Sequence, residues 1–379
     1  MDLLDSRNMD VIVRPVTTSR QRNQFIRYPY QLNAKWPNWV PPLLVSQKET
    51  LNEQLRFWRE NKHQFFLAYT GDQIVGRIAA FTNTDHAAHF GTKDGFFGFL
   101  EAIDSEEVFK KLLKETEAFL SAQGCTKIIG PINPTIHHEL GVLTEGFEQP
   151  PYFMLTYNQT YYDRNIQRAG YQKLKDFGAY KLNTDEFQFT EKIARVQELL
   201  KKRYSLTIRT PRMHDFVNEL KVIHEIYNDA FVNHWGFSPI SWDDFQFLGK
   251  DMKMLLDKEM VLIAEIQGKP IGFLLAIPNL NEVLVKIRNG KLFPFGLIKL
   301  LYLKRNIKSL RVITIAIKKE YQHLGIGGIL YPEIALRAKQ RGYKQAELSW
   351  VVEDNIQMNK ICRDVGGVVT KTYRLYENK

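Results

Sequence analysis

The stretch RVITIAIKKEYQHLGIGGIL, residues 311–330, places an alternating apolar run, a polar loop and three clustered glycines directly before a helical pattern. Glycine at a helix start costs roughly 0.5–1 kcal/mol relative to alanine, so such a cluster indicates either a tight turn or the close approach of another group. Glycines at this place let backbone N–H groups approach a phosphate, and the positive end of the helix dipole favours the anion. The stretch therefore predicts an anion cradle on a strand-loop-helix unit.

The spacing of this cluster separates the known phosphate-binding motifs. A P-loop requires GxxxxGK[ST] and a dinucleotide-binding turn requires GxGxxG directly after its strand, and the sequence has neither. Gln322, Gly325 and Gly327 instead form QxxGxG, which resembles the pyrophosphate-binding motif of the GNAT (Gcn5-related N-acetyltransferase) superfamily. Further on, Asn355-x2-Met358-x3-Cys362-x3-Gly366 resembles the family's last helix, so the resemblance covers most of residues 205–379.

The resemblance implies an acyl-CoA site in this second half, with acetyl-CoA or a longer acyl-CoA as cosubstrate and no metal. Strand 312–317 would splay from strand 345–352 and pair with the pantetheine arm, and an amide near Ala316 or Ile317 would polarise the thioester carbonyl. Preorganised N–H dipoles would stabilise the oxyanion that forms when a neutral amine attacks. The cofactor-binding residues expected from the resemblance are Ile315, Ala316, Ile317, Gln322, Leu324, Gly325, Ile326, Gly327, Gly328 and Asn355, the amides of 324–328 holding the pyrophosphate.

An internal repeat at a spacing of about 196 residues sets the domain organisation. The segment FLAYTGDQIVGRIAAF (66–81) aligns without a gap with LIAEIQGKPIGFLLAI (262–277), and both indicate a β-hairpin. Each half is predicted as βααβββαβ, an α/β (α+β) fold whose mixed, largely antiparallel sheet is flanked by helices. We expect two tandem GNAT-like domains: a degenerate one over 1–185, a helical connector over 186–204 and a catalytic one over 205–379.

The first half lacks the glycine cradle. After the strand that corresponds to 311–317, the chain passes through Asp104, Ser105, Glu106 and Glu107. No glycine there admits a pyrophosphate, and the carboxylates would repel one. We therefore expect this half to bind no CoA and to frame the acceptor pocket.

The acid and the base of the reaction are less well specified. The family's tyrosine, commonly the acid for the leaving thiolate, falls on Cys362, which is better explained as a buried structural cysteine. Tyr373 and Tyr376 on the last predicted strand are substitutes. A base must reach the amine directly or through one water; Glu347, Glu353 and Asp354 lie near the expected site, and Glu353 is favoured over Glu347.

Two loops are rich in prolines, glycines and aromatic residues. They are residues 130–162, with Asn133, a His137-His138 pair and Glu139, and residues 233–242, with His234 and Trp235. These residues either line the acceptor site from opposite halves or lie in loops that prolines and glycines only rigidify. The adjacent histidines lack further ligands at a suitable spacing, so no metal site is predicted.

A basic insert, residues 285–311, separates the second hairpin from the strand before the cradle. It contains eight Lys or Arg and no Asp or Glu, interleaved with Leu, Ile, Phe and Tyr. The composition is typical of an interfacial element that meets anionic lipid, and equally of a solvated basic helix packed on its own domain. Its lysines are too frequent for a membrane span.

Composition and charge give the broad class. The chain has 379 residues, 44% of them hydrophobic, a formal net charge of +10 and two cysteines, Cys125 and Cys362. No disulfide framework or cysteine zinc site follows from two distant cysteines. The acidic start of the chain has no apolar signal region and no stretch is long enough to span a bilayer, so we expect a cytoplasmic protein, peripheral at the inner face of the membrane if the insert meets lipid.

The sequence therefore predicts an acyl-CoA-dependent N-acyltransferase, a transferase acting on a primary amine. The tandem architecture and the ELSWVVEDN passage (347–355) resemble a bacterial GNAT branch near the bacterial ceramide synthases, so a lipid-like long-chain amine is the secondary hypothesis. The alternative is a noncatalytic acyl-CoA-binding or membrane-docking protein. Nucleic-acid binding is the weakest reading, because no recognised module is present. Two copies in one chain can supply the interface that single-domain relatives obtain by dimerising, which is compatible with a monomer.

Overall fold

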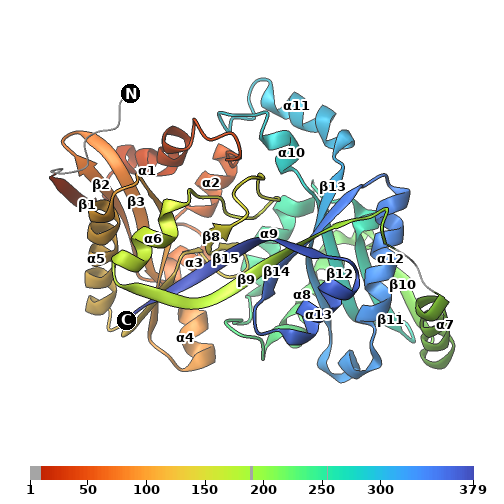
Figure 1. Cartoon of the computed structure of the whole chain (residues 1–379). Helices are drawn as coiled ribbons and strands as arrows, with labels where there is room; N and C mark the ends of the chain where they lie inside the picture. The colour runs from red at the N-terminus through yellow and green to blue at the C-terminus, as the bar shows by residue number, and fades with distance from the viewer. Residues whose placement is uncertain (1–9, 188–190, 254) are drawn as a thin grey trace. The chain divides into compact units, whose positions relative to one another are not determined.

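Two long strands, β9 (Tyr171–Asn183) and β15 (Val368–Asn378), determine how the chain divides. The computed structural model describes residues 10–187, 191–253 and 255–379 (Figure 1). Its first unit comprises the chain as far as Asp176 together with Asn281–Tyr302 and Lys371–Lys379, and its second unit comprises Phe177–Leu280 and Leu303–Thr370. Each long strand begins in one unit and ends in the other.

The first unit contains the predicted strands and helices together with short ones that were not predicted, including three strands within the expected loop 130–162. Its strands before β9 are β1 (Val11–Pro15), β2 (His63–Thr70), β3 (Gln73–Thr82), β4 (Asp94–Ala102), β5 (Lys127–Gly130), β6 (Ile132–Asn133), β7 (Glu139–Leu140) and β8 (Val142–Glu145). Its helices are α1 (Ser19–Leu32), α2 (Leu44–Thr50), α3 (Arg56–Glu60), α4 (Thr84–Phe90), α5 (Glu106–Ala122), α6 (Tyr161–Arg168) and α10 (Asn281–Leu284), with most of α11 (Gly296–Leu303).

Alternation along β2 and β3 gives this unit a core on each face of its sheet. Phe66, Ala68 and Ile78 pack with Val108 and Leu112 of α5. On the opposite face, the ring of Phe65 lies 5.1 Å from that of Phe25 in α1, and Trp58 in α3 lies 5.6 Å from Phe81. The period of two therefore places helices on both faces.

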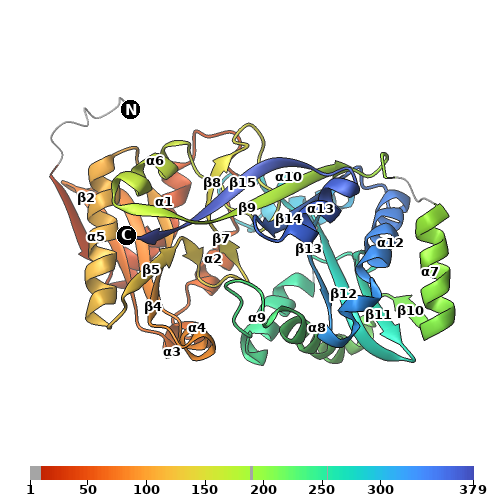
Figure 2. The ribbon, with the colours of Figure 1, turned by 60° about the horizontal axis from the view of Figure 1, so that its bottom comes forward.

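The second unit repeats the pattern. Its strands are β10 (Leu206–Arg209), β11 (Val261–Ile266), β12 (Lys269–Pro278), β13 (Ser309–Ile317) and β14 (Gln345–Val352). Its helices are α7 (Glu191–Tyr204), α8 (Phe216–Phe231), α9 (Trp242–Lys253), α12 (Gly327–Gln340) and α13 (Ile356–Asp364), with 3₁₀ turns at Met213–Asp215, Lys258–Met260, Lys304–Asn306 and Lys319–Leu324. Figure 2 shows α8 and α12 on opposite faces of β11 to β13.

The predicted repeat extends to an irregularity in the two hairpins. In the first, Ala68 pairs with Gly76 and the register shifts directly after Ala68. In the second, Ala264 pairs with Gly272 and the register shifts directly after Ala264. The residues that align in the sequence therefore carry the same β-bulge, which supports a common origin of the two halves.

The last strand of each half pairs with the other half of the sequence. The strand order is β1-β2-β3-β4-β5-β15-β9-β14-β13-β12-β11-β10. In the first unit, β15 pairs antiparallel with β5 through Tyr376↔Gly130 and with β8 through Tyr373↔Leu143. In the second unit, β14 pairs antiparallel with β9, from Gln345↔Asn183 to Val352↔Phe177. We call this arrangement the strand exchange.

The unit boundaries differ from the predicted domains for this reason. The predicted limits at residues 185 and 205 follow the linear repeat, whereas β9 crosses from one unit to the other at Asp176 and Phe177. The expected helical connector contains α7, which belongs to the second unit, and residues 188–190 lie outside the described residues. The basic insert belongs to the first unit as far as Tyr302.

Candidate acyl-CoA site

The glycine cluster lies where β13 passes into α12. After Ile317 the chain makes a 3₁₀ turn over Lys319–Leu324, and Gly325 ends it in the left-handed region with φ 70°. Helix α12 then begins at Gly327. Gly325 is thus needed for the turn itself, because a side chain is strained at that φ.

The conformation of the turn does not explain why positions 327 and 328 are glycine. A Cβ added at Gly328 would meet no atom within 4 Å, and one added at Gly327 would meet only Ile315 Cδ1 at 3.5 Å. Neither has a positive φ, so no strain and no packing inside the protein explains a missing side chain. Open space at the N-terminus of a helix is what the close approach of a phosphate requires.

The amides of the cradle do not all have the same partners. The N–H of Gly328 donates to the Gly325 carbonyl at 3.0 Å, and that of Gly325 donates to the Gln322 carbonyl at 3.4 Å. Ile326 and Gly327, at the N-cap and first position of α12, have no residue four back in the helix to accept from them. Of the five predicted amides, these two are the best placed for an anion.

The predicted splay of two strands is present beside the cradle. β13 and β14 are parallel and pair only from Ser309↔Gln345 to Val312↔Leu348. Beyond that point β13 continues to pair with β12, as far as Ile317↔Gly272. The stretch 313–317 therefore has a partner on one side only, among the residues that the structure describes.

Backbone alternation shows which amides face the open side of β13. The N–H of Lys318 donates to Ile271 on the β12 side, and the Ala316 carbonyl oxygen lies 3.0 Å from the Cβ position of Gly272. The backbone N–H and C=O groups of Lys318 and Ala316 thus point toward β12, so those of Ile317 and Ile315 point to the opposite side of β13. Of the two predicted amides, that of Ile317 faces the splay and that of Ala316 does not.

Gln322 supports this end of the strand. Its side-chain Nε2 donates to the Ile317 carbonyl at 3.0 Å, across the turn. Asn355 is the N-cap of α13, where its side chain accepts from the Met358 N–H at 3.0 Å. Both predicted cofactor residues therefore hold backbone in place within the second unit.

A buried polar cluster that the sequence did not reveal lies at the root of the splay. Arg311 Nε donates to Ser349 Oγ at 2.9 Å, and Ser349 Oγ donates to Glu347 Oε1 at 3.0 Å. The guanidinium also lies 4.8 Å from the ring centroid of Trp350. Arg311 had been included in the basic insert, but it is 1% exposed and belongs to β13. The signal was its place in the alternating run RVITIAI.

The two candidate bases differ in their surroundings. Glu347 is fully buried in β14 and sits in register with Arg311, whereas Glu353 is exposed in the turn after β14. An exposed carboxylate can receive a proton and pass it to water, while a buried one already holds a hydrogen bond.

Cys362 and the tyrosines named as acids are all buried. Burial raises the pKa of the Cys362 thiol to about 12, against a smaller lowering by the Arg363 charge. A CoA thiol has a pKa of roughly 8.5–9, so proton transfer from Cys362 to its thiolate is unfavourable. Tyr373 is fully buried in the part of β15 that belongs to the first unit, and the Tyr376 hydroxyl donates to Asp163 at 2.7 Å.

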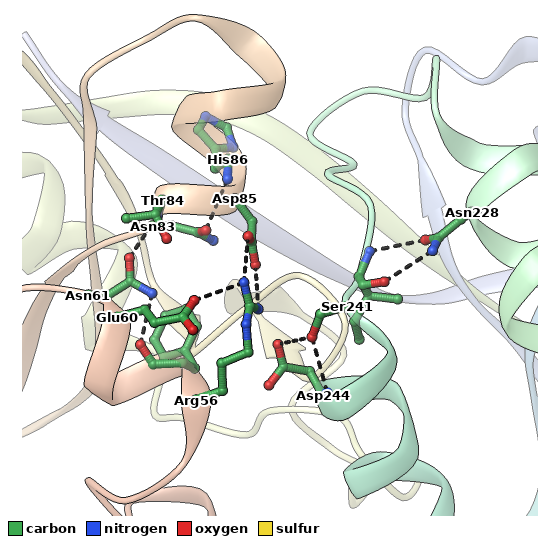
Figure 3. Close-up of polar contacts among 12 residues, drawn as sticks. Arg56, Glu60, Asn61, Asn83, Thr84, Asp85, His86, Asn228, Ser241 and Asp244 are labelled. Atoms are coloured by element: carbon green, nitrogen blue, oxygen red, sulfur yellow. Dashed lines mark hydrogen bonds and ion pairs between the residues drawn. The ribbon is translucent and has the colours of Figure 1, made fainter.

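The loop before α9 is tied to α8 (Figure 3). The side chain of Asn228 donates to the Ile240 carbonyl and accepts from the Ile240 N–H, both at 3.0 Å. The Oγ of Ser241 donates to Asp244 at 2.7 Å. The ring of His234 meets that of Phe231 edge-on with centroids 4.9 Å apart, and the ring centroid of Trp235 lies 5.8 Å from that of Phe177. Burial lowers the pKa of His234, so its imidazole is neutral near pH 7.

The loop over residues 130–162 in the first unit is also held in place by hydrogen bonds from its side chains. Asn158 accepts from the Leu143 N–H at 2.7 Å and donates to the Leu143 carbonyl at 3.1 Å. Asn133 pairs with Glu139 in β6 and β7, and its side-chain oxygen accepts from the Phe99 N–H at 2.6 Å. Asn133 thus has a structural partner, and its expected acceptor role stays a prediction.

The N-terminus of α5, which corresponds to that of α12, faces the protein's own groups. Ser105 Oγ accepts from the Val108 N–H, and Glu106 and Glu107 occupy the first turn. Asp104 accepts from Arg164 at 2.6 Å and from Asn165 at 3.0 Å. The positive end of this helix dipole is already balanced.

Within residues 10–187, 191–253 and 255–379, no group of His, Cys, Asp and Glu side chains is arranged to hold a metal ion. In the same described part of the chain, no helix has the length and apolar character needed to cross a bilayer.

Comparisons with known proteins concern the family of the chain. The family model described as Acetyltransferase (GNAT) family matches residues 220–366. The chain is 35% identical over 382 residues to bacterial ceramide synthase of Caulobacter vibrioides (strain NA1000 / CB15N), covering 98% of each. It is 33% identical over 374 residues to protein YghO of Escherichia coli (strain K12), covering 97% of this chain and 95% of YghO.

Among solved structures, the chain is similar to a tandem GNAT protein from the clavulanic acid biosynthesis pathway. The TM-score is 0.55 with 10% sequence identity, and the alignment covers 97% of this chain and 98% of the other. At that identity the likeness concerns the fold alone, and it includes both halves.

Proposed function

Because the chain belongs to the GNAT family of N-acyltransferases, in its tandem form, we propose that its second unit transfers an acyl group from acyl-CoA to a primary amine. The fold and the family are those predicted from the glycine cluster and the repeat. The donor, the acceptor and the residue roles are the proposal.

One observation carries the proposal: the Cβ positions of Gly327 and Gly328 open into space at the N-terminus of α12. We infer that the amides of Ile326 and Gly327 bind the pyrophosphate, with the turn at Gly325 holding them in place. The pantetheine arm would pair with the open side of β13, in the place that a neighbouring strand would take.

In the proposed reaction, the amine nitrogen attacks the thioester carbonyl carbon and the C–S bond breaks. The Ile317 N–H, directed into the splay, donates to the carbonyl oxygen as negative charge develops. The amine proton goes to Glu353, with Glu347 as the second candidate base. The CoA thiolate is a good leaving group near neutral pH, which reduces the need for an acid in the place of Cys362. Tyr373, which the sequence suggested as the acid, is fully buried in the first unit, so we propose no role for it in the second unit.

For the acceptor we propose a lipid-like long-chain amine. The support is the 35% identity, over nearly the whole chain, to a protein named bacterial ceramide synthase. Within the second unit His234, neutral near pH 7, and Trp235, which is 39% exposed, supply a hydrogen-bond acceptor and an apolar surface for such a molecule. The acceptor role expected for Asn133 and Glu139, which lie in the first unit, stays a prediction from the sequence.

The first experiment measures thermal stability with CoA, acetyl-CoA and acyl-CoAs of increasing length. A ligand at 100 times its Kd stabilises by roughly 2.7 kcal/mol. We expect Gly328→Glu to abolish the shift, because a carboxylate would enter the cradle. Val217→Glu is the matched control: Val217 is also the second residue of its helix, and it is 49% exposed.

The dependence of the thermal shift on the length of the acyl group would identify the acyl-CoA donor. A thermal shift that survives in Gly328→Glu would contradict the cradle. Thiol release that depends on a long-chain amine would then establish turnover, whereas binding without release in the presence of any amine would leave the alternative, a noncatalytic acyl-CoA-binding protein.

A further inference from the structure

Helix α11 (Figure 1) as far as Tyr302 and the loop before it belong to the first unit. They expose large apolar side chains. We call these residues the α11 patch: Phe293, Phe295, Ile298, Leu301 and Tyr302, which are 81%, 74%, 66%, 45% and 72% exposed. Phe295, Ile298 and Tyr302 are spaced by three and four residues, so they share one face of the helix. Leu300 on the other face is buried.

The patch is carried by a well-anchored segment. Both terminal nitrogens of Arg288 donate to backbone carbonyls, Nη1 to Trp36 and Trp39 and Nη2 to Pro37, at 3.2 to 3.4 Å. The Gly290 carbonyl accepts from the Leu44 N–H at 2.9 Å.

The glycines of the segment explain its close packing. A Cβ at Gly290 would lie 2.6 Å from the Pro42 carbonyl oxygen, and one at Gly296 would lie 2.2 Å from that of Lys291. The apolar side chains are therefore presented by a fixed backbone rather than by a loop that collapses onto the protein. An exposed cluster of this kind marks an interaction surface.

The charges around the patch identify the kind of partner. Lys286, Lys291 and Lys299 are exposed on the same segment of the first unit, and residues 285–311 contain no Asp or Glu. A second copy of the chain would bring the same lysines together without acidic partners, and lysine is depleted at protein interfaces. An anionic bilayer surface provides both an apolar layer and negative headgroups.

We propose that the α11 patch docks the first unit on the surface of an anionic phospholipid bilayer. The aromatic and aliphatic side chains enter the boundary between headgroups and acyl chains, and the lysines bind the headgroups. α11 has eight residues and is too short to cross a bilayer, so the proposed contact is with the bilayer surface. This inference does not depend on acyl transfer, although it would bring the enzyme to the membrane that holds a lipid-like amine.

The test is co-sedimentation of the full chain with vesicles of phosphatidylcholine alone and of phosphatidylcholine mixed with phosphatidylglycerol. We expect binding to the mixed vesicles that weakens as salt increases. The double variant F293S/F295S should lose at least about tenfold in affinity, because these two side chains are the most exposed of the patch and would be buried in the bilayer. K291E/K299E should lose about as much, but only on the anionic vesicles.

Ile356→Ser is the matched control for the apolar variants. Ile356 is 79% exposed in α13 of the second unit, so this substitution removes exposed apolar surface that is not part of the α11 patch. Melting curves of the variants verify that they fold. Equal binding to both vesicle types, or unchanged binding by F293S/F295S, would overturn the proposal. A dimer in sedimentation velocity that F293S/F295S removes would assign the patch to a second copy instead.

Since vesicle binding requires no turnover, this result is separable from the proposed function. Gly328→Glu should bind vesicles normally while losing its response to acyl-CoA. Loss of vesicle binding in that variant would contradict the assignment of the two surfaces.

Discussion

Gly328 offers the sharpest test at the scale of a single residue. In Gly328→Ala the methyl group meets no protein atom, so the variant should be more stable by roughly 0.5–1 kcal/mol, as alanine is in a helix. The same methyl group should hold a phosphate away from the amides and weaken acyl-CoA binding by about tenfold or more, since a hydrogen bond to a charged group contributes roughly 1.5–3 kcal/mol. Thermal unfolding and calorimetric titration measure the two effects.

The two effects have opposite signs, so they are easily told apart from a general perturbation. Gly327→Ala, whose methyl would touch only Ile315, should behave in the same way. A stabilised Gly328→Ala that binds acyl-CoA as tightly as the original chain would mean that nothing approaches this helix.

Single residues also show which features of the site could be predicted from the sequence. Gly325, Gly327 and Gly328 form a local motif, so their place at the start of a helix was predictable. The direction of the Ile317 amide was not, because it depends on which side of β13 pairs with β12. Arg311 and Ser349 were missed because their contact joins two strands that are 38 residues apart in the chain.

At the scale of elements, the strand exchange predicts which unit a substitution in β15 loosens. Leu375 is fully buried in the segment Lys371–Lys379 of the first unit. Leu375→Ala should cost about 2–5 kcal/mol, as buried leucine truncations do. Hydrogen exchange should accelerate in β5 and β8, which are remote in sequence, before it accelerates in β14.

The matched variant is Leu348→Ala in β14, which should loosen the second unit first; Leu348 is 4% exposed. If Leu375→Ala instead loosened α13 and β14 first, β15 would be a part of the half in which it is encoded.

The elements themselves were largely predictable, because the hairpins, the strand before each long helix and the helices have strong local periodicity. Which strands pair with each other was harder to predict. An alternating strand such as β9 satisfies β14 or a neighbour in its own half equally well, and no local feature of its sequence distinguishes the two.

For the whole molecule we expect one acyl-CoA per chain in spite of two related halves. The amides of Ile326 and Gly327 at the start of α12 have no acceptor four residues back in the helix, whereas the start of α5 is capped by Ser105 and carries acidic side chains. Isothermal titration should therefore give a stoichiometry of one, and Gly328→Glu should reduce it to zero. A second equivalent that persists in Gly328→Glu would place a site in the first unit.

The strand exchange also has a consequence for how the chain is made. Synthesis proceeds from the N-terminus, and domains commonly begin to fold as they emerge from the ribosome. The first unit includes Lys371–Lys379, which follow the whole of the second half in the sequence, and these pair with β5 and β8. The half that is synthesised first therefore cannot be completed until the second half has also been synthesised, and until then β5 lacks the strand that pairs with it in the finished protein.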